Sequence, residues 1–167
     1  INFLLKIRKG VILLTYEELL TLSDSKNLVV KEKNIPGYGG RLYKNRIAIN
    51  RSLPTQAEKS CVLAEEIGHH CTTTGNILDQ SDSMNRKQEY RARLYGYNLR
   101  VGLIGIIEAY KACCRNLHEM AEHLDVPDDY LADVIDCYRS KYGQYVAVDN
   151  YMIYFIPQLA VMKINNL

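Results

Sequence analysis

Two glutamates and two histidines stand together in the run LAEEIGHHCTT, residues 63 to 73, and their spacing suits a metal site. Glu65 and His69 are four residues apart, and so are Glu66 and His70. On a helix, residues at i and i+4 lie on one face, one turn apart. Either pair therefore offers two ligands to one ion if the segment is helical.

Only one of these two registers keeps a group that can activate water. If Glu65 and His69 bind the metal, Glu66 stands beside the ligands and can accept a proton from bound water, as the middle Glu does in H-E-x-x-H. If Glu66 and His70 bind instead, the neighbouring position is Ile67, which cannot transfer protons. The first register is therefore preferred, and His70 stays as an alternative ligand. A solvated polar helix face is the competing interpretation.

A catalytic zinc ion takes three protein ligands and keeps one position open. Glu89 is the only carboxylate in the helix predicted over residues 86–101, and it follows His69 by 20 residues. A loop and a helix can fold back over that length, and Gly68 would let the returning helix approach closely. Four cations flank Glu89; they are either the solvated side of this helix or a surface that steers an acidic substrate segment. They are Arg86, Lys87, Arg91 and Arg93.

The elements that must position these residues can be outlined from local signals. Two T-x-x-E capping boxes, at residues 15–18 and 55–58, indicate helix starts. The second helix is expected over about 56–72 and carries the candidate site. Before it, residues 27–32 are typical of a strand and residues 41–50 of a hairpin. A small antiparallel sheet is therefore predicted to precede the site-bearing helix.

The last third of the chain is predicted to be mostly helical. Residues 117–138 have the rhythm of a helix-turn-helix, with Pro127 in the first turn of the second helix. Five Asp residues between 125 and 136 oppose contact with phosphates, so DNA is not an expected partner. We expect a helical region that helps to dock a protein substrate, followed by a β-hairpin over residues 144–157.

The composition limits the classes of protein to which the chain can belong. The chain has 167 residues and a net charge of +2, so no overall basic field argues for nucleic acid. The five cysteines are odd in number and form no C-x-x-C pair, which favours reduced thiols in the cytoplasm. No apolar run reaches the roughly 18 residues that a membrane span needs. The predicted organisation is a segment that is either non-native or an upstream extension (1–14), a core (15–103) and a helical C-terminal region (104–167).

Three runs of the sequence resemble the ImmA/IrrE family of metallo-endopeptidases, in the branch found in phages and integrative conjugative elements of Gram-positive bacteria. The resemblance covers nearly the whole chain from about Thr15 and is most specific around residues 58–70 and 75–93. The runs are TYEELL, GRLYKNRIAINRSLPTQAEKSCVLAEEIGHH and TTTGNILDQSDSMNRKQEYRAR.

This resemblance implies an α+β fold with a zincin-like metallopeptidase core and a zinc-dependent endopeptidase activity. It also implies a partner: a helix-turn-helix repressor of a mobile element, which the enzyme cleaves to relieve repression. By position, Glu66 matches the general base, His69 the second metal ligand and Glu89 the downstream acidic ligand. Glu65 stands where most of the family has His.

Glu65 changes the expected chemistry of the metal. A Glu-His-Glu site places two negative charges around the ion, where a His-His-Glu site places one. The metal becomes less electrophilic, and its preference moves from Zn²⁺ toward Mn²⁺ or Fe²⁺. The alternative function is therefore a non-catalytic regulator, a degenerate metallopeptidase that binds a repressor or DNA without cutting.

Overall fold

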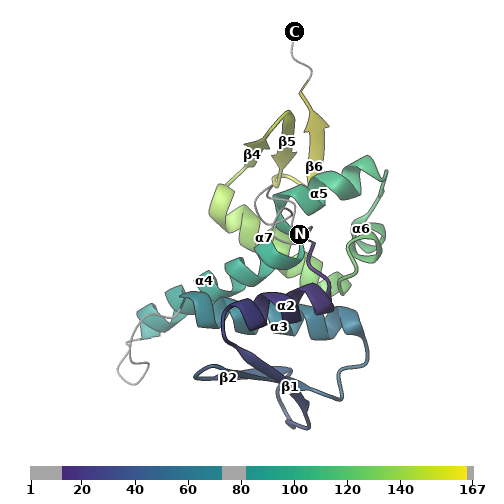
Figure 1. The fold of residues 1–167 in the computed structure, drawn as a ribbon. Coiled ribbons are helices and arrows are strands. Elements are labelled where there is room, and N and C mark those ends of the chain that lie inside the picture. The colour runs from purple at the N-terminus through teal and green to yellow at the C-terminus, as the bar shows by residue number, and fades with distance from the viewer. Residues whose placement is uncertain (1–12, 73–81, 165–167) are drawn as a thin grey trace. The chain divides into compact units, whose positions relative to one another are not determined.

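A computed structural model describes residues 13–72 and 82–164 of the chain. They form two compact units, Leu14–Arg100 and the residues from Val101 onward (Figure 1). Each unit combines helices with one three-stranded sheet. The α+β class predicted from the sequence is confirmed, and the division between the units falls three residues before the predicted one.

The sheet of the first unit has the strand order β1-β3-β2. Strands β2 (Gly40–Tyr43) and β3 (Arg46–Asn50) form the predicted antiparallel hairpin. Strand β1 (Val29–Lys33) pairs with β3 in parallel, so the prediction of a wholly antiparallel sheet is wrong. The alternation of side chains identifies the strands, but it does not say which neighbour β1 joins. If β1 had paired with β2 instead, every strand pair of this sheet would have been antiparallel.

Three helices complete the first unit: α2 (Tyr16–Ser25), α3 (Gln56–Thr72) and α4 (Asp82–Arg100). Both predicted capping boxes are formed. Thr15 Oγ1 accepts from the Glu18 amide at 3.2 Å, and Thr55 Oγ1 accepts from the Glu58 amide at 3.1 Å. These bonds satisfy helix-start amides that would otherwise lack partners. Helix α3 has the predicted bounds, whereas α4 starts four residues earlier than expected.

The core of the first unit lies between α3 and the sheet. Helices α2 and α3 lie on one side of the sheet, where Ile47 and Ile49 of β3 are almost completely buried (Figure 1). Leu14 is also fully buried, and its amide donates to the Leu99 carbonyl at 3.1 Å. The Leu14 carbonyl accepts from the Arg100 guanidinium. Leu14 is thus part of the core, although the sequence placed it in an extension; residues 1–12 of that extension lie outside the described residues.

Two glycines let α3 and α4 cross at close range. A Cβ on Gly68 would lie 2.2 Å from the Ala92 carbonyl oxygen. A Cβ on Gly96 would lie 3.0 Å from the Ala64 carbonyl oxygen. No side chain fits between backbones at these distances, so each crossing point needs glycine. The close approach expected at Gly68 is present, and its counterpart at Gly96 was not anticipated.

The second unit contains three helices followed by a sheet of strand order β4-β5-β6 in the part of the chain that the structure describes. Two helices joined by residues 124–127 occupy the segment predicted as a helix-turn-helix. The predicted terminal hairpin is present and is extended by a third strand, β6, which the sequence did not indicate. The elements are α5 (Gly102–Lys111), α6 (Leu117–His123), α7 (Asp128–Tyr142), β4 (Tyr145–Val148), β5 (Tyr151–Tyr154) and β6 (Ala160–Lys163).

Within the described residues, no helix is both long enough and apolar enough to span a bilayer.

The glycine crossing predicts the effect of two alanine substitutions. Gly68→Ala should lower the free energy of unfolding by about 1–3 kcal/mol, because the new methyl group forces the backbones of α3 and α4 apart. Gly105→Ala is the matched control: its Cβ would first meet Leu124 at 3.4 Å, an ordinary contact. That variant should be unchanged or gain up to about 1 kcal/mol from helix propensity. Urea unfolding measures both, and equal effects would contradict the crossing.

Candidate functional site

Helix α3 presents the four candidate side chains beside its buried stripe. Leu63 and Ile67 are fully buried against the core. The side chains of the EExxHH run are only partly exposed. This partial exposure is compatible with a ligand role, and the competing interpretation of a solvated polar face stays open. The partly exposed residues are Glu65, Glu66, His69 and His70.

The crossing of α3 and α4 brings His69 and Glu89 together. His69 Nε2 lies 3.6 Å from Glu89 Oε2, and both side chains remain partly open to solvent. Glu89 Oε1 also accepts from Arg93 Nε at 2.9 Å. The sequence proposed His69 and Glu89 as partners across 20 residues, and the structure places them side by side.

The separation of these two atoms suits two ligands of one ion. Zinc binds imidazole nitrogen and carboxylate oxygen at about 2.0–2.2 Å, so two ligands of a tetrahedral ion lie about 3.4 Å apart. The observed 3.6 Å between His69 Nε2 and Glu89 Oε2 is close to that value. The donor types also suit zinc, manganese and ferrous iron. His69 and Glu89 thus fit two positions of a divalent cation site.

Glu65 is near these residues without completing a cluster. Its negative charge contributes to the raised pKa values of Glu66 and Arg93. Among the residues that the structure describes, no three His, Cys, Asp or Glu side chains gather closely enough to hold an ion. The predicted ligand set is therefore present as a pair, with Glu65 on the adjacent turn of α3.

Glu66 points toward the sheet and lies against strand β2. A Cβ on Gly40 would lie 2.5 Å from Val62 Cγ1 and 3.0 Å from both Glu66 Cγ and Glu66 Oε1, so the strand passes close to α3 and to this carboxylate at a residue without a side chain. The Leu42 backbone N–H donates to the Glu66 carboxylate. Sequence reasoning missed both contacts; the Gly39-Gly40 pair at the start of the strand was the available signal for a close approach.

This environment raises the pKa of Glu66 to about 7. Burial is the largest cause, the negative charge of Glu65 adds to it, and that of Glu89 contributes less. The Leu42 amide acts in the opposite direction. A carboxyl group with a pKa near neutrality can both accept and release a proton at physiological pH. Position, burial and charge thus make Glu66 suited to proton transfer.

The four cations of the predicted basic cluster fall into two groups. Arg93 is paired with Glu89 and belongs to the site. Arg86, Lys87 and Arg91 are exposed on α4 and line a shallow surface with Tyr90. They remain candidates for contact with an acidic substrate segment.

The two cysteines on either side of the candidate motif lie in surroundings that suit packing. Cys61 is buried, and burial raises the pKa of its thiol to about 11. Cys71 forms a side-chain hydrogen bond with Tyr95 of α4; burial and this bond raise the pKa of Tyr95 to about 12. A thiol that stays protonated is a poor metal ligand. Cys61 therefore contributes to packing rather than to the site.

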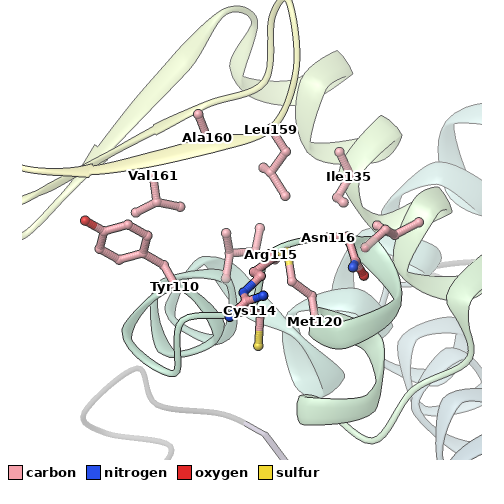
Figure 2. A pocket seen from close by; sticks show the side chains of 11 residues that line it. Tyr110, Cys114, Arg115, Asn116, Met120, Ile135, Leu159, Ala160 and Val161 are labelled. Carbon is pink, nitrogen blue, oxygen red and sulfur yellow. The ribbon is translucent and has the colours of Figure 1, made fainter.

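A separate hollow of about 270 Å³ lies within the second unit, between α5, α6 and β6 (Figure 2). Its lining includes the apolar residues Ile106, Met120 and Val161 and the polar residues Tyr110 and Arg115. It contains none of the candidate site residues.

Comparison with known proteins leaves the family open: no protein-family model, no curated protein and no solved structure matches the chain.

The raised pKa of Glu66 predicts a pH-dependent stability. A carboxyl group whose pKa rises from 4.5 to about 7 on folding favours the native state when protonated. In metal-free protein, the free energy of unfolding should therefore fall between pH 4.5 and pH 7. Partial solvent screening limits the loss to on the order of 2 kcal/mol.

Urea unfolding in chelator at pH 5 to 8 measures this loss by comparison of wild type with Glu66→Gln. The variant lacks the titrating group, so the difference between the two proteins should grow with pH. A constant difference across the range would mean that the pKa of Glu66 is not raised.

Proposed function

We propose that this protein is a metal-dependent endopeptidase, with zinc as the first candidate metal. The observation that carries the proposal is the arrangement around Glu66. Its carboxyl group, with a pKa near 7, sits one helical turn from His69, which pairs with Glu89 at 3.6 Å. Such a combination of a cation-binding pair and a neutral-pH proton acceptor suits hydrolysis.

The residues of the chain would divide the work as follows. His69, Glu89 and Glu65 would hold the ion, which would polarise the scissile carbonyl and acidify water when bound. Glu66 would accept the proton of the attacking water and return it to the leaving amine. Arg93 holds the carboxylate of Glu89 in place through its 2.9 Å contact.

Strand β2 offers a way to position a peptide beside Glu66. It is an edge strand in the part of the chain that the structure describes. The Leu42 N–H that bonds Glu66 points away from β3, so the unpaired edge of β2 faces the candidate site. An extended peptide can add to such an edge through main-chain hydrogen bonds. Its carbonyl groups would then pass close to the carboxyl group of Glu66.

The proposed substrate is a helix-turn-helix repressor of a mobile genetic element, and its cleavage would relieve repression in the cytoplasm. This part rests on the resemblance of the sequence to ImmA/IrrE endopeptidases. The two carboxylates of the proposed ligand set keep Mn²⁺ and Fe²⁺ as alternatives to Zn²⁺.

A second candidate function is a regulator that binds a repressor without cutting it. One observation favours it: among the described residues, the third donor, Glu65, is not gathered with His69 and Glu89. In that case the polar residues of α3 and α4 would form a contact surface. Catalysis and binding can be separated by a variant that removes the proton acceptor and keeps its shape.

Glu66→Gln should abolish cleavage of the proposed helix-turn-helix repressor. We expect the cleavage rate with saturating metal to fall at least 100-fold, because general-base catalysis contributes about 10²–10⁴. The amide oxygen can still accept from Leu42, so the fold should persist. Gel analysis and mass spectrometry of the repressor fragments measure the rate.

Glu17→Gln is the matched control, because Glu17 is an exposed residue of α2 and loses the same charge. It should cleave at the wild-type rate. Equal cleavage by wild type and Glu66→Gln would contradict the peptidase proposal. Repressor binding without cleavage by any of the three proteins would support the regulator.

A further inference from the structure

The outer face of the first sheet, on the side away from α3, carries a concentration of positive charge. Side chains alternate along each strand, and odd-numbered residues of β1 and β2 face outward. The strand register places Lys31 and Arg41 on either side of Ala48. Arg46 lies in the next outward row, between Val29 and Tyr43. We define this cationic face by Lys31, Lys33, Arg41 and Arg46.

These four cations are not neutralised by acidic side chains of the described ranges, because none of them forms an ion pair there. The nearest acid on the strands, Glu32, points to the opposite side and binds Lys59 Nζ of α3 at 2.8 Å. The sequence from residue 33 to residue 57 contains five Lys and Arg and no Asp or Glu. The face is therefore cationic by composition as well as by geometry.

Arg46 on the central strand β3 lies diagonally across from Lys31 and Arg41, so these like charges repel one another without an acidic side chain between them. Lys31 and Arg41 are separated by the width of two strand spacings, about 10 Å. The net charge of the whole chain is only +2, because the residues from Val101 onward contain nine Asp and Glu but five Lys and Arg. The net charge therefore does not reveal this local excess of cations. An anionic partner would remove the repulsion.

Two exposed tyrosines stand among the cations. The side chain of Tyr43 is 68% exposed and that of Tyr38 is 58% exposed. The guanidinium of Arg41 lies 5.4 Å from the ring centre of Tyr38, and Lys44 Nζ lies 5.5 Å from that of Tyr43. Each ring also keeps a large part of its surface open to solvent, where a base can stack on it.

The face is also hollowed. A depression of about 450 Å³ is lined by Val29, Ile35 and Tyr43 together with the cations. Its floor is formed by Ala48, whose small side chain leaves space between Lys31 and Arg41. A planar group can enter this space while an attached anion meets the surrounding cations.

We infer that this cationic face binds single-stranded nucleic acid, with phosphates on Lys31, Lys33, Arg41 and Arg46 and a base stacked on Tyr43. Cationic grooves interleaved with exposed aromatic rings are the physical basis of binding to single strands. A duplex keeps its base faces stacked inside and would leave the tyrosines unused. An acidic peptide would satisfy the charge but offers no ring to stack. The inference does not rest on the proposed peptidase, because Glu66 lies on the α3 side of the sheet.

Fluorescence anisotropy with labelled 12-mers of oligo-dT and oligo-U tests the inference on the full chain. Binding should be detectable at 50 mM salt and should weaken steeply at 200 mM. The triple variant Lys31→Ala, Arg41→Ala, Arg46→Ala should bind at least 10-fold more weakly. Its slope of log affinity against log salt should be smaller by about 2, because each phosphate that is no longer neutralised reduces the slope by roughly 0.7.

The matched control removes three exposed cations from α4 through Arg86→Ala, Lys87→Ala and Arg91→Ala. It should keep the wild-type affinity within about twofold. Tyr43→Ala, which changes no charge, should weaken binding roughly 5- to 100-fold because the ring on which a base stacks is removed. Because Tyr43 is exposed, its replacement should leave the fold intact. Tyr43→Ala therefore still tests the inference if thermal unfolding shows that the triple variant is unstable.

Several results would overturn the inference. One is the absence of binding at 50 mM salt, and another is an equal reduction of affinity in the α4 control. Tighter binding of a 12-base-pair duplex than of either single strand would assign the face to duplex DNA. Competition by a poly-glutamate 12-mer as effective as that by the oligonucleotides would assign it to acidic peptides.

Discussion

The close crossing of α3 and α4 is the constraint on which the first unit depends. Without side chains at Gly68 and Gly96, the backbones of the two helices approach to contact distance. This approach places Glu89, from the second helix, 3.6 Å from His69 on the first. A larger residue at either glycine would push the helices apart and with them His69 and Glu89, the two residues of the proposed cation-binding pair. Packing and chemistry therefore share the same requirement for glycine.

The three glutamates around His69 occupy different electrostatic surroundings. Glu89 is half exposed and accepts from Arg93 Nε at 2.9 Å, which fixes the position of its carboxylate. Glu66 is partly buried between α3 and β2, beside the charge of Glu65, and its pKa rises to about 7. A buried carboxyl group with a raised pKa suits proton transfer, whereas an exposed carboxylate held by an Arg side chain suits the role of a ligand. The roles assigned to Glu89 and Glu66 follow from this difference.

Local signals in the sequence predicted the helix and hairpin elements well, whereas relations between elements were harder to predict. The capping boxes at Thr15 and Thr55 fixed two helix starts because each is formed within one turn. The partnership of His69 and Glu89 could be anticipated because helical spacing and one glycine constrain it. The parallel pairing of β1, the strand β6 and the contact of Gly40 with Glu66 depend on tertiary packing, which short-range patterns do not specify. The cationic face could not be predicted for the same reason, since only the strand register brings its residues together.

The central claim is that His69, Glu89 and Glu65 form a cation site beside Glu66. Isothermal titration of chelator-treated protein with Zn²⁺, repeated for three variants, tests it most directly. The account predicts one ion per chain in wild type, a reduction in affinity of at least tenfold for His69→Ala, little change for His70→Ala and tighter binding for Glu65→His. Unchanged or weaker affinity in Glu65→His would refute Glu65 as a ligand. Loss of binding in His70→Ala with retention in His69→Ala would contradict the site as a whole.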